Sequence, residues 1–194
     1  EGKALVEQKG FNKEEALKEF MDYVHSYLGD DEGDQIMKAF TLADKAHEGQ
    51  FRASGEPYIM HPLAVADILA HLQIDHITLM AALMHDVVED TSYSKEDLEE
   101  MFGSEVAFLV DGVTKLNQFQ YETKEDRQME NYRKMILAMA KDVRVVVIKL
   151  GDRLHNMRTL KHMRSDKQKR IAKETLEIFA PLAHRLGIFN VKWE

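Results

Sequence analysis

Apolar residues recur at three- and four-residue intervals along most of this chain, a spacing that predicts amphipathic helices. Asn12 followed by Glu15 is a capping-box pattern, which predicts a helix that begins there and ends near Gly29. A second helix is expected from about Asp34 to Gln50, with one buried stripe. That stripe consists of Ile36, Phe40, Ala43 and His47. Further helices are expected from Pro62 onward, around 81–90, after Ser94, and over about 105–116, 125–141 and 166–180, the last of which meets Pro181.

Turn and strand signals are few. The segment 54–57 (Ser-Gly-Glu-Pro) is the clearest turn, and the polar and aromatic residues 117–124 predict a loop. The β-branched run from Val143 to Ile148 has strand propensity. The helical pattern continues after it without a break, so we predict the start of a buried helix. Without repeats, low-complexity tracts or Gly/Ser linkers, the prediction is one all-α domain.

Composition narrows the class of protein. The chain has 194 residues, with 44% apolar and 31% charged residues, as in soluble globular domains. No apolar stretch approaches the roughly 20 residues needed to span a bilayer, and no secretory leader is recognisable. With no cysteine, disulfides, thiolate zinc sites and cysteine nucleophiles are excluded. The default expectation is a cytoplasmic protein that does not bind a membrane.

The net charge of −8 argues against general nucleic-acid binding, but the charge is uneven. Between Lys149 and Lys173 there are nine basic residues against two acidic ones. A local basic patch in an acidic protein suggests a polyanionic small ligand, although charge alone favours a solvated helix face.

The candidate chemistry centres on His85 and Asp86, which lie in an apolar segment with Glu89 and Asp90 close behind. If the segment is helical, residues four apart stack on one face. Burying so much charge is costly unless a metal, a proton or a counter-charge compensates it. A His-Asp pair, with His61 and Asp152 elsewhere in the chain, matches a two-His, two-Asp divalent metal site, which predicts metal-dependent phosphate-ester hydrolysis.

Asp152, Asn156 and Thr159 lie one helical turn apart and share one face. Taken alone, these three polar residues are typical of a solvent-exposed helix face. Together with the His-Asp motif, they indicate a face that contacts a ligand. His61, at a loop-to-helix junction before Pro62, is open to both a structural and a ligand role. The other histidines are given only structural roles: His25, His47, His71, His76, His155, His162 and His184.

Four ordered motifs resemble the hydrolase half of the RelA/SpoT homologue family, which makes and destroys the alarmone (p)ppGpp. They are residues 52–62 (RASGEPYIMHP), 85–91 (HDVVEDT), 111–116 (DGVTKL) and 152–160 (DRLHNMRTL). The similarity runs from about residue 35 to the end. It implies an all-α HD-domain helical bundle with one divalent metal, usually Mn²⁺. The implied ligands are His61, His85, Asp86 and Asp152. The residues alone suit Mn²⁺, Fe²⁺, Co²⁺ or Zn²⁺ equally.

Glu89 and Asp90 match the acidic pair that distinguishes alarmone hydrolases among HD proteins. A carboxylate one turn from a metal ligand can take or return a proton from water whose pKa the metal lowers. We expect Glu89 to transfer this proton and Asp90 to orient or share it. The alternative is that both side chains only cap or hydrate the helix end.

The resemblance also implies nucleotide-binding positions, namely Arg52, Ser54, Asn156 and Thr159. Arginine suits this task because it stacks on bases and pairs with phosphates. Ala53 departs from the pattern, since a lysine is common there. Gly151 stands where alanine is usual, at a cost of about 0.5–1 kcal/mol of helix stability. Basic residues such as Arg158 or Lys161 are expected to offset phosphate charge.

The expected organisation is an N-terminal helical extension (1–34), an HD-type hydrolase domain (35–180) and the start of a linker (181–194) towards an absent synthetase domain. The predicted activity is Mn²⁺-dependent hydrolysis of the 3′-pyrophosphate of ppGpp or pppGpp, giving GDP or GTP and pyrophosphate. Synthetase and regulatory domains are expected partners in the full-length protein. The alternatives are another HD-type nucleotide phosphohydrolase, which has no need of the 52–57 segment, and a non-catalytic alarmone-sensing module.

Overall fold

The computed structural model describes residues 12–117, 133 and 136–188, and within them the chain is all-α, as predicted. Its only β-pairing in this part is an isolated bridge between Phe51 and Pro57, which closes the predicted turn. The helices are α1 (Lys13–His25), α2 (Asp30–Ala46), α3 (Met60–Ala70), α4 (His76–Leu83), α5 (Val87–Asp90), α6 (Lys95–Phe102), α7 (Ser104–Asn117), α9 (Val143–Arg158), α10 (Ser165–Glu174) and α11 (Ala180–Arg185). A 3₁₀ turn covers Leu160–His162, and a π-helical turn covers Thr175–Phe179.

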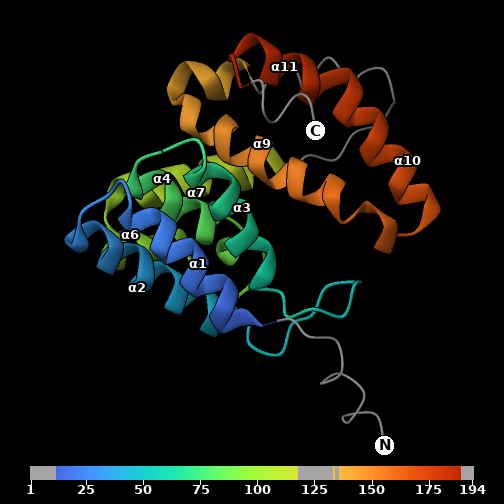
Figure 1. Cartoon of the computed structure of the whole chain (residues 1–194). Helices are drawn as coiled ribbons and strands as arrows, with labels where there is room; N and C mark the ends of the chain where they lie inside the picture. Colours follow the sequence, from blue (N-terminus) through green and yellow to red (C-terminus); the bar gives the residue numbers. More distant parts are fainter. Residues whose placement is uncertain (1–11, 118–132, 134–135, 189–194) are drawn as a thin grey trace, which may run out of the picture.

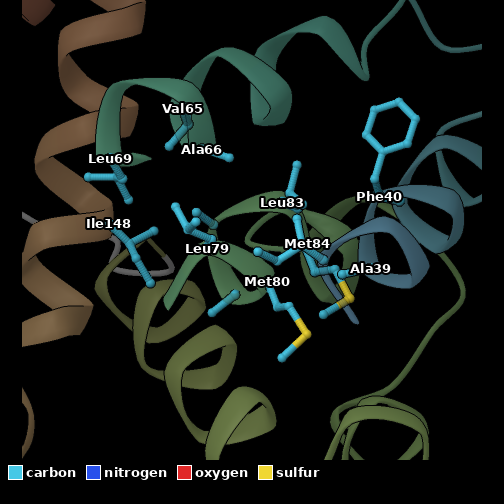
Figure 2. Packing of buried hydrophobic residues seen from close by; sticks show 14 of the residues in the cluster. Ala39, Phe40, Val65, Ala66, Leu69, Leu79, Met80, Leu83, Met84 and Ile148 are labelled. Atoms are coloured by element: carbon cyan, nitrogen blue, oxygen red, sulfur yellow. The ribbon is translucent and has the colours of Figure 1, made fainter. Parts of the chain in front are cut away.

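Helix α4 lies at the centre of the main hydrophobic core, surrounded by α2, α3, α7 and α9 (Figure 2). All of its residues from Thr78 to Leu83 are buried, and Met84 behind them is fully buried as well. The His-Asp motif follows this helix directly. The packing of α4 therefore keeps His85 and Asp86 buried next to the core.

The β-branched run predicted as a helix opens α9, and the structure explains its composition. Val145 and Ile148 pack into the main core, whereas Val146 and Leu150 belong to a second core. That second core is closed by the chain segment that returns alongside α9 through α10 and α11 (Figure 1). Because α9 is covered on two sides, the four consecutive residues from Val145 to Ile148 are all apolar and buried.

Several predicted boundaries were wrong. The first helix ends at His25 rather than near Gly29, because Gly29 is the N-cap of α2. Helix α2 therefore begins at Asp30 and ends at Ala46, earlier at both ends than predicted. Its predicted buried stripe is confirmed.

The last predicted helix continues past Pro181 to Arg185. A proline inside an α-helix clashes with the carbonyl four residues back and removes a hydrogen bond. Here the π-helical turn ends just before it, so that Pro181 lies in the first turn of α11, where proline is tolerated. The predicted loop over 117–124 begins too early, because Asn117 is the last residue of α7, and the rest of that loop lies outside the described residues. Most of the predicted helix over 125–141 also lies outside them, but 136–141 are helical.

Candidate metal centre and nucleotide cavity

The predicted continuous helix over 81–90 is wrong, because α4 ends at Leu83 and a turn over 84–86 separates it from α5. The break leaves the carbonyl of Ala82 without a helical partner, and Nδ1 of His85 lies 2.7 Å from that oxygen. The backbone nitrogen of Asp90 still donates to the carbonyl of Asp86, at 2.9 Å. The predicted one-turn stacking of these two carboxylates is therefore present, whereas His85 points inward.

His61, His85 and Asp86 form a candidate metal-binding group whose ligand atoms all lie within 4.8 Å of one another. His61 comes from the first turn of α3, and the other two from the turn after α4. All three are buried, with His85 completely inaccessible to solvent. Oδ2 of Asp86 lies 3.2 Å from Nε2 of His85 and 3.7 Å from Nε2 of His61.

Asp152 lies beside this group on α9 and approaches it through His61, with 3.2 Å between Oδ1 and Nε2. Its carboxylate is otherwise held by neighbours on the same helix. Lys149 Nζ lies 2.5 Å from Oδ2, and Asn156 Nδ2 donates to Oδ1 at 2.6 Å. The structure thus brings all four predicted ligands together, and the tightest cluster consists of the first three.

The electrostatics of the group favour a bound cation. Burial opposes ionisation of Asp86, but the imidazoles of His85 and His61 hold the pKa of Asp86 below its usual value. At Asp152, burial is likewise outweighed by the Lys149 ammonium and by His61, so its pKa is well below normal. Burial lowers the pKa of His85, but the carboxylates of Asp86 and Asp152 outweigh it and raise that pKa to about 9.

The donor atoms fit a divalent metal. Nδ1 of His85 is occupied by the Ala82 carbonyl, so Nε2 is the atom that would give up its proton and offer its lone pair to a cation. This Nε2 is buried, and its 3.2 Å contact with Oδ2 of Asp86 lacks hydrogen-bond geometry. Two imidazoles with one or two carboxylates suit Mn²⁺, Fe²⁺, Co²⁺ or Zn²⁺.

The acidic pair lies at the mouth of the same site. Glu89 and Asp90 are exposed on the single turn of α5, and both line the adjoining cavity. Oδ2 of Asp90 accepts a hydrogen bond from the phenol of Tyr58 at 3.1 Å, and the same phenol lies 2.8 Å from Oδ2 of Asp86. Burial, then the charges of Asp86 and Asp90, raise the pKa of Tyr58, so this hydroxyl keeps its proton.

Three of the predicted nucleotide residues contact one another. Nη2 of Arg52 donates to Oδ1 of Asn156 at 3.0 Å and lies 3.4 Å from Oγ1 of Thr159. Ser54 lies in the same cavity wall, and its Oγ has no hydrogen-bond partner in the described structure. These contacts join the 50–58 segment to the polar face of α9, two parts of the chain that are far apart in sequence.

Apart from His85 and its Ala82 contact, these groups line one cavity of about 530 Å³, a size that suits a small-molecule ligand. Its basic wall differs from our expectation, because Arg158 and Lys161 do not line it. After the 3₁₀ turn the chain reverses, and Lys167 and Arg170 of α10 face the cavity instead, with Met163 one turn before them. The full lining is Arg52, Ala53, Ser54, Tyr58, His61, Asp86, Glu89, Asp90, Lys149, Asp152, Asn156, Thr159, His162, Met163, Lys167 and Arg170.

Several contributors to the site were missed from sequence, among them His162, which lines the cavity although only a structural role was expected for it. Tyr58 was seen only as part of a motif, and its contacts with two carboxylates depend on tertiary structure. His155 had been given a plain structural role, but its Nδ1 lies 2.8 Å from Nδ1 of His61. Its position three residues after Asp152 was the one available signal.

An all-α fold with a buried His-Asp turn and a second buried histidine on a neighbouring helix is typical of an HD-type domain. A family model described as the HD domain matches residues 39–189, and the chain belongs to this family. The resemblance to RelA/SpoT homologues is also confirmed by the relatives below. No helix in the described ranges is both long and apolar enough to cross a bilayer.

The chain is 63% identical over 153 residues to a guanosine-3′,5′-bis(diphosphate) 3′-pyrophosphohydrolase of Haemophilus influenzae, covering 79% of this chain and 23% of that protein. It is 56% identical over 171 residues to the bifunctional (p)ppGpp synthase/hydrolase SpoT of Escherichia coli, and the match covers 88% of this chain and 24% of that protein. A solved structure described as a metazoan orthologue of SpoT that hydrolyses ppGpp matches with a TM-score of 0.59 and 32% identity, covering 74% of this chain and 83% of that one. The chain thus spans about a quarter of the length of the two bacterial relatives.

Proposed function

We propose that this domain hydrolyses the 3′-pyrophosphate of ppGpp or pppGpp, releasing pyrophosphate and GDP or GTP. The observation that carries the proposal is the single cavity that joins a His-Asp cation group, an acidic pair and the Arg52–Asn156–Thr159 cluster. The names of the relatives, which describe ppGpp hydrolysis, support it further.

His61, His85 and Asp86 would hold the cation, with Asp152 as a fourth ligand from α9. We propose Mn²⁺ as the resident ion, a choice that comes from the family resemblance. Bound there, a divalent cation would polarise the pyrophosphate and lower the pKa of a coordinated water. Lys149, now paired with Asp152, would share that carboxylate with the cation.

The side chains around the cation group would divide the remaining work. Glu89 would take the proton of the attacking water, and Asp90 would orient or share it. Water attacks the phosphorus attached to the 3′-oxygen, and the P–O bond to the ribose breaks, so that the 3′-oxygen leaves and is protonated. Lys167 and Arg170 would offset the charge of the phosphates at the cavity wall.

At the other end of the cavity, Arg52 would frame the guanosine together with Ser54, Asn156 and Thr159. The guanidinium contacts the side chains of Asn156 in α9 and Thr159 at its C-cap, and this ordering reduces the entropy lost when a base stacks on it. We further propose that this domain is the hydrolase part of a longer cytoplasmic protein with synthetase and regulatory regions, as the length of the relatives supports.

The test is incubation with ppGpp and Mn²⁺, with nucleotides and pyrophosphate separated by anion-exchange chromatography. We expect GDP and pyrophosphate in equal amounts, lost on chelation and in Asp152→Ala. Binding of ppGpp without turnover, with Mn²⁺ bound, would reject the hydrolase and favour a sensing module.

A further inference from the structure

The hydroxyl of Tyr58 connects the two halves of the site. Its oxygen lies 2.8 Å from Oδ2 of Asp86, in the cation group, and 3.1 Å from Oδ2 of Asp90, in the acidic pair. A phenol carries one proton, so it donates a strong hydrogen bond to only one carboxylate at a time. The two carboxylates therefore compete for the same donor.

The aromatic ring of Tyr58 is held in place by packing against a neighbouring side chain. It stacks on the buried ring of His47, with 4.5 Å between centroids. Nδ1 of His47 lies 3.0 Å from Oε1 of Gln50, and the amide nitrogen of Gln50 donates to the carbonyl oxygen of Asp90 at 3.2 Å. The 47–58 segment thus holds Asp90 at its backbone and at its side chain.

Asp90 depends on these outside contacts. Helix α5 has only four residues, and Asp90 is its exposed last residue. A carboxylate in this position would otherwise sample several rotamers, and ordering it costs conformational entropy. The contact with Tyr58 selects one orientation, which points along the cavity wall that both residues line.

We propose that Tyr58 is a positioning residue that orients Asp90 for proton transfer and links this orientation to the charge on Asp86. When a bound cation neutralises Asp86, that carboxylate becomes a weaker acceptor, and the hydroxyl donates more strongly to Asp90. The acidic group is then ordered when the cation is in place. The catalytic part of this proposal rests on the proposed hydrolase function, whereas the link to the cation group does not.

The test compares Tyr58→Phe with Tyr27→Phe, since both variants keep the ring and remove one phenol hydrogen bond. Tyr27 donates to the carbonyl of Ile74 at 3.2 Å and does not line the cavity. Relative to this control, we expect Tyr58→Phe to lower kcat on ppGpp by about 10- to 100-fold, with KM within about threefold. Because the hydroxyl competes with the cation for Asp86, calorimetric titration of Tyr58→Phe should show an Mn²⁺ affinity at least about threefold tighter. Thermal unfolding without metal checks that both variants are folded.

A second variant separates the two contacts. Gln50→Met removes the bond to the Asp90 carbonyl and leaves Asp86 untouched, so it should lower kcat without changing Mn²⁺ affinity. If Tyr58→Phe equals Tyr27→Phe in both kcat and Mn²⁺ affinity, the proposal is wrong. A raised KM with unchanged kcat would make Tyr58 a substrate contact and also overturn it. If the wild-type protein shows no turnover, the proposed hydrolase function is wrong. The Mn²⁺ affinities of the variants then test on their own whether Tyr58 is coupled to the cation group.

Discussion

The Nδ1 atoms of His61 and His155 lie 2.8 Å apart inside the site. Both rings are buried, and two nitrogens at this distance share one proton, so one ring donates and the other accepts. With Nε2 of His61 giving its lone pair to the proposed cation, the neutral ring carries its proton on Nδ1, so His61 donates and His155 accepts. Burial, with the charges of His61 and Arg52, lowers the pKa of His155 to about 3, which keeps it a neutral acceptor.

Removing this acceptor should weaken metal binding. We expect His155→Leu to reduce Mn²⁺ affinity by about 10- to 100-fold, because the ring of His61 loses the contact that sets its orientation. His155→Asn supplies an acceptor oxygen in a similar place and should retain affinity within about fivefold. Calorimetric titration measures both. Equal affinities for His155→Leu and wild type would show that this contact does not orient His61.

The close packing of α7 on α9 should make Gly112 sensitive. A Cβ at this position would lie 2.8 Å from Cγ2 of the buried Val145. Alanine gains about 1 kcal/mol of helix propensity over glycine, but overpacking costs about 1–3 kcal/mol. We expect Gly112→Ala to lower the free energy of unfolding, measured in urea. Gly151→Ala, whose Cβ would meet Leu69 and Val65 at 3.3 Å, should lower it less. The reverse order would contradict this packing argument.

The N-terminus of α9 should give a pH-dependent contribution to stability. Asp142 is its N-cap, and hydrogen bonds from the Arg144 guanidinium lower the pKa of Asp142 below the usual value. Below pH 4 the unfolded chain therefore binds more protons at this residue than the folded chain does. Its contribution is complete above the ordinary pKa and is lost as pH falls through the folded pKa.

Two variants check this sign by urea unfolding at pH 7 and pH 3. Asp142→Ala should cost about 1 kcal/mol at pH 7 through loss of the cap. Asp142→Asn keeps an acceptor for the cap but cannot titrate, so it should lose less stability between the two pH values than wild type loses. An identical loss in both proteins would mean that Asp142 contributes nothing to acid sensitivity.

Ala53 lines the cavity at a position where the family resemblance implies a lysine. We expect Ala53→Lys to lower KM for ppGpp by up to about fivefold, because an exposed ion pair contributes at most about 1 kcal/mol. Steady-state kinetics at moderate salt measure this, and kcat should change little. Ala140→Lys, also exposed but outside the cavity, is the control. Equal KM values in the two variants would place residue 53 away from the bound phosphates.

Much of the fold could be predicted because its helices follow local rules. The caps at Asn12 and Ser94, and the helix through the β-branched run at Val143, were predicted correctly. The turn between α4 and α5 was not, because an apolar sequence continues through Met84 and nothing local marks a break. The helix past Pro181 was missed because the π-helical turn that accommodates it follows from packing against α9.

Some residues of the candidate site could likewise be predicted from sequence, and others could not. His61, His85, Asp86 and Asp152 converge as expected because motifs identified them before any geometry was known. Tyr58, His155, Lys167 and Arg170 could not be selected from sequence, because their contacts and positions depend on how α3, α9, α10 and the 50–58 segment pack. The ligand, acid-base and nucleotide-binding roles stay predictions.

The central claim is that water attacks the phosphorus next to the 3′-oxygen and releases pyrophosphate. It is tested most directly by turnover of ppGpp with Mn²⁺ in ¹⁸O-labelled water, followed by mass spectrometry of the products. If water attacks this phosphorus, the released pyrophosphate contains one ¹⁸O and GDP contains none. Labelled orthophosphate, or label in the nucleotide, would place the attack at a different bond and contradict the proposed reaction.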